Sequence, residues 1–415
     1  MTTERTFVIV GAGLAGSKTA EALRSEGFEG RIILIGEEAE RPYERPPLSK
    51  DYLQGKSEKE KIYVHPERWY ADHNVDLERG IRVTSIDPSA HRVTGDRGEA
   101  IHYHKLLLAT GSSARVLSLP GADPERVFML RRVEDCEQLK TAFTTASRAA
   151  MVGAGWIGLE VAAAARTAGV DVTVLETSEL PLLRVLGREV AKVFADLHRR
   201  HKVDLRCGVH VAEITGKQPA RATGVRLVDG TQIDADMVVV GIGAFPNTQL
   251  AEAAGLDVDN GVQVDEHLRT SNPDIYAAGD VANQFHPFFG KRIRIEHWAN
   301  ALNQPAVAAK SMLGIDAVYD TLPYFYSDQY ELGMEYSGYV DPNGYDEVIF
   351  RGDKDALEFI AFWMNDDKIL AGMNVNIWDE TDNIRALIKS GRRIDKARLV
   401  DTSTALTDLL TPSAS

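Results

Sequence analysis

The fold is decided by two copies of one pattern, Val8-Ile-Val-Gly-Ala-Gly-Leu-Ala-Gly16 and Ala150-Met-Val-Gly-Ala-Gly-Trp-Ile-Gly158, which stand far apart in the chain. In each copy an apolar run leads into Gly-x-Gly-x-x-Gly, and a helical pattern follows the glycines. Strand, tight turn and helix are the parts of a dinucleotide-binding unit. The chain therefore predicts two such units.

A second apolar run follows each glycine turn and ends at a carboxylate. Arg31-Ile-Ile-Leu-Ile35 leads to Glu37, and Asp171-Val-Thr-Val-Leu175 leads to Glu176. In such a unit the glycines let the backbone approach a pyrophosphate, and an acid about 20 residues after the last glycine binds a ribose hydroxyl, which is the spacing found in both copies. One copy alone also occurs where a helix merely packs closely on a strand. Two complete copies indicate two dinucleotides, and a nicotinamide donor with a flavin acceptor is the couple we expect.

The composition is that of a soluble globular protein with several domains. The chain has 415 residues, of which 44% are hydrophobic and 26% charged, and no stretch approaches the ~20 apolar residues of a membrane span. The first apolar run has neither a basic leader nor a small-residue cleavage site, so we interpret it as a core strand of a cytoplasmic protein. A net charge of −14 argues against nucleic acid or an anionic membrane as the main partner.

The cysteines exclude one branch of flavin chemistry. Cys136 and Cys207 are the only two, and they are widely separated in the chain. A redox dithiol beside a flavin needs a closely spaced pair, which this chain lacks. We expect both to pack as small apolar residues, and no Cys/His spacing predicts a metal site.

The order of the apolar runs predicts an inserted domain. Leu106-Leu-Leu-Ala-Thr-Gly111 and Met237-Val-Val-Val-Gly-Ile-Gly243 end two units, whereas the strand-like Asp274-Ile-Tyr-Ala-Ala-Gly-Asp280 has no glycine turn of its own and is assigned to the first. We therefore predict an α/β fold with two Rossmann-like dinucleotide-binding domains and a C-terminal α+β interface domain. The expected boundaries are an FAD-binding domain at 1–113 and 243–319, an NAD-binding domain at 114–242, and the interface domain at 320–415.

The C-terminal part differs in character. Aromatic residues crowd together between Tyr324 and Tyr345. Residues 357–364 and 368–375 read as two strands joined by a short turn, and a helix is predicted from about Glu380 with Gly391 as its stop.

Several motifs together carry a family resemblance: 8–16 (VIVGAGLAG), 45–50 (RPPLSK), 106–111 (LLLATG), 130–131 (LR), 153–163 (GAGWIGLEVAA), 237–243 (MVVVGIG), 277–280 (AAGD) and 327–329 (SDQ). On these motifs the chain resembles, over essentially its whole length, the FAD-dependent ferredoxin reductases of bacterial cytochrome P450 and Rieske dioxygenase systems. The resemblance implies a glutathione reductase-like fold, FAD as cofactor, NADH as donor and a [2Fe-2S] ferredoxin as acceptor. We expect a monomer or a weak homodimer.

The resemblance also implies the site residues. For FAD they are Gly11, Gly13, Leu14, Ala15, Gly16, Glu37, Arg45, Lys50, Val83, Ala109, Thr110, Gly111, Arg131, Gly279, Asp280, Glu296, His297 and Trp298. For NAD they are Gly153, Gly155, Trp156, Ile157, Gly158, Glu160, Glu176, Arg184, Gly241, Ile242 and Gly243.

Lys50 and Glu160 are the candidate catalytic pair. Hydride transfer between stacked rings needs geometry rather than an acid or base, so this lysine and this glutamate would tune the flavin and the entry of nicotinamide. On the residues alone, Lys50 also reads as a surface lysine after a Pro-Pro turn, and Glu160 as an acid favoured by the N-terminus of a helix.

Glu176 favours NADH over NADPH, because a carboxylate accepts from a free 2′-hydroxyl and repels a 2′-phosphate. Arg184 opposes this reading, since an arginine can bind that phosphate. Its alternative role is an ion pair with an acid such as Glu179.

The acceptor side leaves alternatives open. Tyr326 stands where relatives commonly carry tryptophan before Ser-Asp-Gln, so aromatic packing is expected while ferredoxin docking is open. Basic residues at 291–294 and 385–398 read either as docking charges or as solvated surface. The same scaffold also suits an NADH oxidase, a rubredoxin or quinone reductase, or a nucleotide-responsive flavoprotein like apoptosis-inducing factor.

Overall fold

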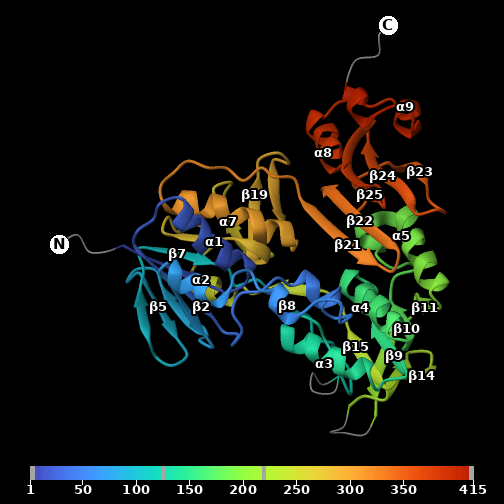
Figure 1. Ribbon diagram of the computed structural model, residues 1–415, viewed down its shortest axis with the longest axis horizontal. Helices are drawn as coiled ribbons and strands as arrows, with labels where there is room; N and C mark the ends of the chain where they lie inside the picture. Colours follow the sequence, from blue (N-terminus) through green and yellow to red (C-terminus); the bar gives the residue numbers. More distant parts are fainter. Residues whose placement is uncertain (1–4, 123–126, 217–220, 411–415) are drawn as a thin grey trace. The chain divides into compact units, whose positions relative to one another are not determined.

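The computed structural model describes residues 5–122, 127–216 and 221–410. Its contacts divide the chain into two compact units (Figure 1). Unit 1 comprises Met1–Pro46, Glu58–Ser113 and Ala244–Thr321, and unit 2 comprises Pro47–Ser57, Ala114–Gly243 and Leu322–Ser415. Residues 47–57, which the sequence assigns to the first dinucleotide-binding domain, therefore lie in unit 2, and so does the C-terminal part.

A parallel five-stranded sheet forms the core of unit 1, with the strand order β18-β7-β1-β2-β3. The bounds are β1 Thr6–Val10, β2 Arg31–Gly36, β3 Val75–Arg79, β7 Lys105–Leu108 and β18 Ile275–Ala277. Strands of a parallel sheet are covered on both faces, which is why they read as continuous apolar runs. The predicted strands at 6–10 and 31–35 are confirmed, and β18 pairs with β7 although it comes from far along the chain.

Two helices that are distant in sequence pack together in unit 1: α1 (Leu14–Ser25) and α7 (Trp298–Met312) (Figure 1). Smaller elements complete the unit: helices α2 Glu67–Asp72 and α6 Gln249–Ala253; a sheet of β4 Val83–Asp87, β5 Arg92–Gly95 and β6 Ala100–His102; a sheet of β17 Val262–Val264, β19 Ala282–His286 and β20 Lys291–Arg294; and the pair β8 Ser112–Ala114 with β16 Ala244–Pro246.

Unit 2 repeats the parallel plan with four strands in the order β11-β10-β9-β15. The bounds are β9 Arg148–Val152, β10 Asp171–Glu176, β11 Asp204–Cys207 and β15 Met237–Val240, with a small sheet of β12 Val211–Thr215, β13 Gly224–Leu227 and β14 Gln232–Asp234. Its helices are α3 Val133–Phe143, α4 Trp156–Thr167 and α5 Leu183–Arg200. Helix α5 is broken at Gly187, whose φ of 75° is not helical.

The C-terminal part of unit 2 is an antiparallel sheet in the order β21-β22-β25-β24-β23. Its strands are β21 Tyr324–Gln329, β22 Leu332–Gly338, β23 Glu347–Asp353, β24 Glu358–Asn365 and β25 Lys368–Val375, followed by α8 Thr381–Ser390 and α9 Lys396–Val400. The two predicted strands and the helix after Glu380 are confirmed. Gly391 ends α8 in the left-handed conformation at φ 57°, as a glycine stop signal does.

Trp363 of β24 anchors this sheet within unit 2. The side chain is 1% exposed, and its indole Nε1 donates to the carbonyl oxygen of Leu186 at 3.1 Å. That carbonyl directly precedes the helix break at Gly187. The indole therefore satisfies a polar group that the interrupted helix leaves to other donors.

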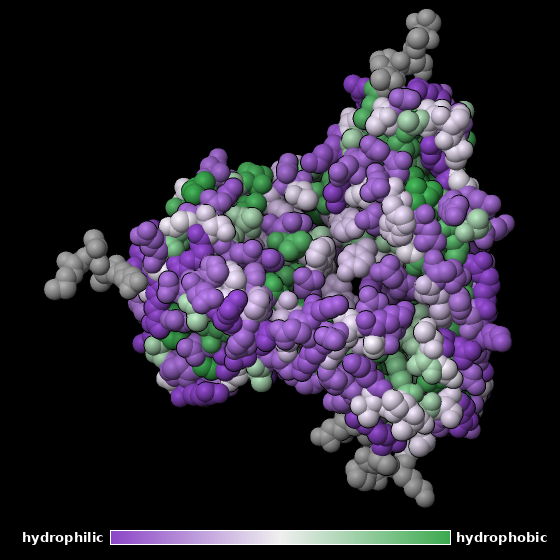
Figure 2. Space-filling model, viewed as in Figure 1, coloured by the Kyte–Doolittle hydropathy of each residue, from purple (hydrophilic) through white to green (hydrophobic). Residues whose placement is uncertain are grey.

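The visible surface is largely hydrophilic, with apolar residues scattered in small groups (Figure 2). Among the helices of the described residues, we find none with both the length and the apolarity that crossing a bilayer requires.

Replacing Trp363 with phenylalanine should destabilise the protein by about 2 kcal/mol, because the substitution removes an indole donor and opens a small cavity. The free energy of unfolding in urea measures this loss. Trp378→Phe is the matched control, since Trp378 is 54% exposed and should change little. Equal losses in the two variants would contradict the anchoring role of Trp363.

Candidate functional site

The first glycine turn connects β1 to α1 at the carboxyl edge of the parallel sheet of unit 1. Gly11 has φ +113°, and a Cβ there would lie 2.1 Å from the carbonyl oxygen of Ala109, while a Cβ on Gly16 would lie 2.0 Å from that of Gly11. Internal packing therefore requires these two glycines. Gly13 is different, because its φ of −91° suits any residue and no heavy atom lies within 4 Å of its Cβ position. The open space beside Gly13 fits a ligand that approaches the backbone at a helix N-terminus, as a pyrophosphate does.

The carboxyl ends of β2 and β18, which β1 and β7 separate, bring two acids to the same edge of the sheet. Glu37 follows β2, and its Oε2 lies 3.1 Å from Nε of Arg82. Asp280 follows β18 in a turn at Gly279, where a Cβ would lie 3.0 Å from Cβ of Ala15 in α1. The turn that carries Asp280 is thus packed on the start of α1, beside the open glycine.

The N-terminus of α7 supplies a second set of polar groups in unit 1. Trp298 is its first residue, and the indole Nε1 donates to Oε2 of Glu44 at 3.2 Å. Glu296 accepts from Ser112 Oγ at 3.0 Å and from Arg294. Burial lowers the pKa of His297 to about 4, so the imidazole is neutral at pH 7. A helix N-terminus next to a neutral histidine favours an electron-rich ligand.

Most of the residues that the resemblance assigns to FAD belong to unit 1. Leu14 and Ala15 open α1, Val83 begins β4, and Arg45 Nη2 lies 2.9 Å from Glu38 Oε1. Lys50 and Arg131 belong to unit 2. The backbone N–H of Arg131 donates to Asp135 at 2.8 Å, just before α3.

In the second glycine turn, between β9 and α4, two glycines are again required by internal contacts and the third is open. A Cβ on Gly153 would lie 2.5 Å from the oxygen of Gly241, and one on Gly158 would lie 2.3 Å from the oxygen of Gly153. Gly155 has φ −79° and nothing within 4 Å of its Cβ position. Beside it Ile157 is 42% exposed. The turn thus leaves room for a second pyrophosphate at the start of α4.

The carboxylate of Glu176 is held against this second turn. Its Oε2 accepts from the backbone N–H of Ala154 at 2.7 Å, and its Oε1 accepts from that of Ser178 at 2.8 Å. These bonds fix the acid at the end of β10, where a ribose is expected. Arg184 is exposed and makes no ion pair with a described residue, whereas Arg188 is the residue that pairs with Glu179. The suggested pairing of Arg184 with Glu179 is therefore wrong.

Lys50 and Glu160 are joined in unit 2. Lys50 Nζ lies 2.6 Å from Glu160 Oε1, with side chains only 12% and 4% exposed. Ser327 Oγ donates to Oε1 at 2.7 Å, and Ser49 Oγ donates to Oε2. Lys50 also lies over the ring of Tyr326, 5.4 Å from its centroid. The interpretation of Lys50 as a surface lysine is therefore wrong, because its ammonium group is buried and forms an ion pair with the carboxylate of Glu160.

Sequence reasoning missed Ser49, Ser327, Gln329 and His198 as site residues. The motif Ser327-Asp-Gln329 carries the family resemblance without predicting a role for its side chains, and no signal marks His198 on α5. Serine, glutamine and histidine are common on surfaces, so only the fold reveals that these are buried.

The basic stretches are partly neutralised. Arg292 Nη1 donates to the backbone oxygens of Val264 and Asn283, and Arg294 pairs with Glu296. In the second stretch, acids of the same sheet and helix pair with Arg385, Arg393 and Lys396. Arg292 and Arg294 are therefore parts of the fold, so substituting either would disturb more than a docking surface.

Burial disfavours the thiolate form of both cysteines. Burial raises the pKa of Cys136 to about 12 and also raises that of Cys207. Within the described ranges, no group of three or more His, Cys, Asp or Glu side chains is placed to hold a metal ion.

Comparison with known proteins agrees with this geometry. Residues 5–305 match the family described as pyridine nucleotide-disulphide oxidoreductase, and residues 324–410 match the reductase C-terminal domain. The chain is 40% identical over 403 residues to the 5,5'-dehydrodivanillate O-demethylase ferredoxin reductase subunit of Sphingobium sp. (strain NBRC 103272 / SYK-6), covering 97% of each. It is 40% identical over 408 residues to the anthranilate 1,2-dioxygenase system ferredoxin–NAD(+) reductase component of Burkholderia cepacia, covering 97% of this chain and 99% of that protein.

Among solved structures, a chain of the covalent putidaredoxin reductase–putidaredoxin complex matches with a TM-score of 0.94 and 36% identity, over 99% of both chains. These similarities confirm the predicted fold class and the family resemblance.

The two kinds of glycine in each turn can be separated by substitution. Gly155→Ala should leave the thermal midpoint nearly unchanged, because its Cβ meets nothing, but should weaken dinucleotide binding to unit 2 roughly tenfold, about 1.4 kcal/mol. Gly158→Ala should instead destabilise the fold, because its Cβ would lie 2.3 Å from a carbonyl oxygen. Thermal melts and NADH titration measure the two effects. Unchanged NADH affinity in Gly155→Ala would remove the ligand from this turn.

Proposed function

The chain belongs to the pyridine nucleotide-disulphide oxidoreductase family, and from this premise we propose that it is an FAD-dependent NADH:ferredoxin oxidoreductase. In this function electrons pass from NADH through FAD to a [2Fe-2S] ferredoxin, which serves a P450 or a Rieske oxygenase. The reductase C-terminal domain and the near full-length similarity to ferredoxin reductase subunits of oxygenase systems support the acceptor.

One observation carries the redox half of the proposal. Each glycine turn contains two glycines that internal contacts require and one, Gly13 or Gly155, that the fold itself does not require. A glycine that no contact within the protein requires is explained by a ligand that approaches its Cα. Because both turns share this feature, two dinucleotides are accounted for, and FAD with NADH is the pair that fits the family.

The roles of the chain's own residues follow from the geometry. When bound, FAD accepts a hydride from NADH and passes electrons singly to an iron–sulphur acceptor. Glu176, held by two backbone N–H groups, orients the ribose of NADH. The ion pair with Glu160 fixes the position of the Lys50 ammonium group in a buried setting, where electrostatic interactions act more strongly than in water. The thiols of Cys136 and Cys207 take no part, because burial keeps them protonated at pH 7.

The acceptor decides between this function and its alternatives. We expect a yellow holoprotein with one FAD per chain that reduces a [2Fe-2S] ferredoxin with NADH under anaerobic conditions. Ferredoxin reduction should be much faster than the reaction with oxygen, rubredoxin or a soluble quinone. Steady-state kcat/KM values for the four acceptors make the comparison. Higher values for oxygen or a quinone would assign the chain to an oxidase or a quinone reductase, and a slow reaction with a long-lived nucleotide complex would assign it to a sensor.

The donor preference should reside in Glu176. Glu176→Gln should shift the ratio of kcat/KM for NADH to that for NADPH toward NADPH, by about 1–3 kcal/mol, because the negative charge that repels a 2′-phosphate is lost. Glu179→Gln is the matched control, since that acid is exposed and paired with Arg188. If both variants keep the wild-type ratio, Glu176 does not discriminate between the 2′-hydroxyl of NADH and the 2′-phosphate of NADPH.

A further inference from the structure

Four buried polar side chains form a continuous hydrogen-bonded chain within unit 2. They are Glu160 of α4, Ser327 and Gln329 of β21, and His198 of α5, with exposures of 4%, 1%, 0% and 0%. Ser327 Oγ lies 2.7 Å from Glu160 Oε1, Gln329 Nε2 lies 3.1 Å from Ser327 Oγ, and His198 Nε2 lies 2.8 Å from Gln329 Oε1. The chain thus connects one end of the Lys50–Glu160 pair to a histidine on another helix.

The donors in this chain all point toward Glu160. Gln329 uses its amide N–H to donate to Ser327, so its amide oxygen must accept from His198. His198 therefore carries its proton on Nε2. Burial lowers the pKa of His198 to about 4, which keeps the ring neutral at pH 7 and leaves this proton in place. Because Ser327 already accepts from Gln329, its own hydroxyl proton is directed at the carboxylate.

The direction of these hydrogen bonds matters because burying a carboxylate costs free energy unless hydrogen-bond donors surround it. Glu160 accepts from Lys50, Ser49 and Ser327, which come from two separate segments of the chain. If the amide of Gln329 were reversed, its oxygen would face Ser327, and the hydroxyl would donate to the amide instead of to Glu160. His198 Nδ1 is buried and has no hydrogen-bond partner among the described residues, so a proton placed there would be left unpaired. With the proton on Nε2, the ring offers Gln329 a donor and not an acceptor, which opposes this reversal.

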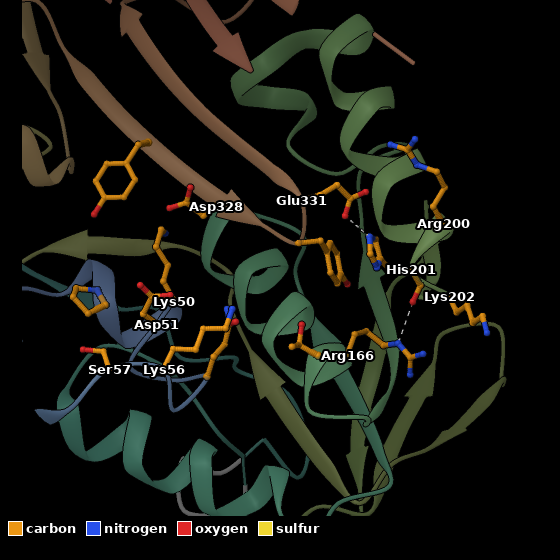
Figure 3. Close-up of a pocket in the computed structure, with 15 residues that line it drawn as sticks. Lys50, Asp51, Lys56, Ser57, Arg166, Arg200, His201, Lys202, Asp328 and Glu331 are labelled. Carbon is orange, nitrogen blue, oxygen red and sulfur yellow. Dashed lines mark hydrogen bonds and ion pairs between the residues drawn. The ribbon is translucent and has the colours of Figure 1, made fainter. Parts of the chain in front are cut away.

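The Lys50 end of the pair borders solvent. Lys50 lines a pocket of about 980 Å³ together with Asp328 and Tyr330, and Figure 3 shows Lys50 and Asp328 on the same side of it. Burial raises the pKa of Asp328, and the charges of Lys50 and Glu160 also act on that carboxyl. Lys50 thus has two acids near it, and the donors on Glu160 favour the pairing with Glu160.

We propose that His198, Gln329 and Ser327 are positioning residues for the Lys50–Glu160 pair, with the Nε2–H of His198 setting the direction of every donor between them. The proposal rests on the proposed function, in which that pair serves flavin reduction by NADH. The proposal adds three residues to that function. They act on the ion pair through Glu160 and not through contact with FAD or NADH.

The first test measures flavin reduction by NADH in the FAD-loaded protein, by stopped flow without any ferredoxin. Ser327→Ala should lower the limiting rate of reduction about tenfold, the order expected for one hydrogen bond to a charged group, with little change in the Kd for NADH. Ser337→Ala is the matched control: its hydroxyl is also buried, at 2% exposed, on the adjacent strand β22 and outside the chain of donors. This control should keep the wild-type rate.

The second test separates donor direction from packing at His198. His198→Gln can place an N–H near the Nε2 position and should retain most of the rate, whereas His198→Met fills the space without a donor and should slow reduction. The double variant His198→Met/Ser327→Ala should be no slower than Ser327→Ala alone, because His198 acts through Ser327. These variants also decide the question if Ser327→Ala does not fold.

A third measurement reads the proton directly. In holoprotein labelled with ¹⁵N-histidine, the signals lost in His198→Gln should be those of a neutral ring protonated on Nε2 at pH 7. An Nδ1–H tautomer or a charged ring would overturn the proposal, as would equal reduction rates in Ser327→Ala, His198→Met and Ser337→Ala. If wild-type flavin is not reduced by NADH at all, the proposed function fails, whereas the tautomer measurement still tests the direction of the donors.

Discussion

The close approach of a helix to the strand before it is the constraint on which both parallel sheets depend. At each glycine turn a single added methyl group would lie 2.0–2.5 Å from a backbone oxygen, closer than any side chain tolerates. This approach fixes where α1 and α4 begin relative to β1 and β9. The parallel arrangement brings the ends of β2 and β18, with Glu37 and Asp280, to the same edge as the first turn, and the end of β10, with Glu176, to the same edge as the second. The positions of the two candidate ligand sites therefore follow from backbone packing. Each acid needs only to stand at the end of its strand, next to the glycine turn.

A buried carboxylate imposes the second constraint, and it acts on unit 2. Glu160 lies in the first turns of α4, but its donors come from residues 49–50 and from β21. Segments that are far apart in sequence are thereby held at one point. These contacts help to tie Pro47–Ser57 to unit 2, although the chain on either side of it belongs to unit 1. A buried carboxylate at position 160 without these donors would be strongly destabilising.

The sequence was informative where burial produces a pattern. Strands such as β1 and β2 are covered on both faces, so an unbroken apolar run identifies them, and the spacing to Glu37 and Glu176 follows from the length of one strand–helix–strand unit. The network of Ser327, Gln329 and His198 left no such pattern, because a polar residue is buried only through contacts that the tertiary fold creates. For the same reason Arg292 appeared to be a free positive charge, since its acceptors are backbone oxygens that a sequence does not display.

The strand order of unit 1 also determines when its parallel sheet can be completed during synthesis of the chain. Strand β7 pairs with β1 on one side and with β18 on the other, but β18 is synthesised only after the whole nucleotide-binding part of unit 2. Until then the nascent sheet carries an open edge made of Leu106, Leu107 and Leu108, and α1 lacks α7, the helix that packs against it. Unpaired apolar edges are the usual starting points of misassembly. The inserted topology thus delays completion of the first parallel sheet until the segment that follows the insertion has been synthesised.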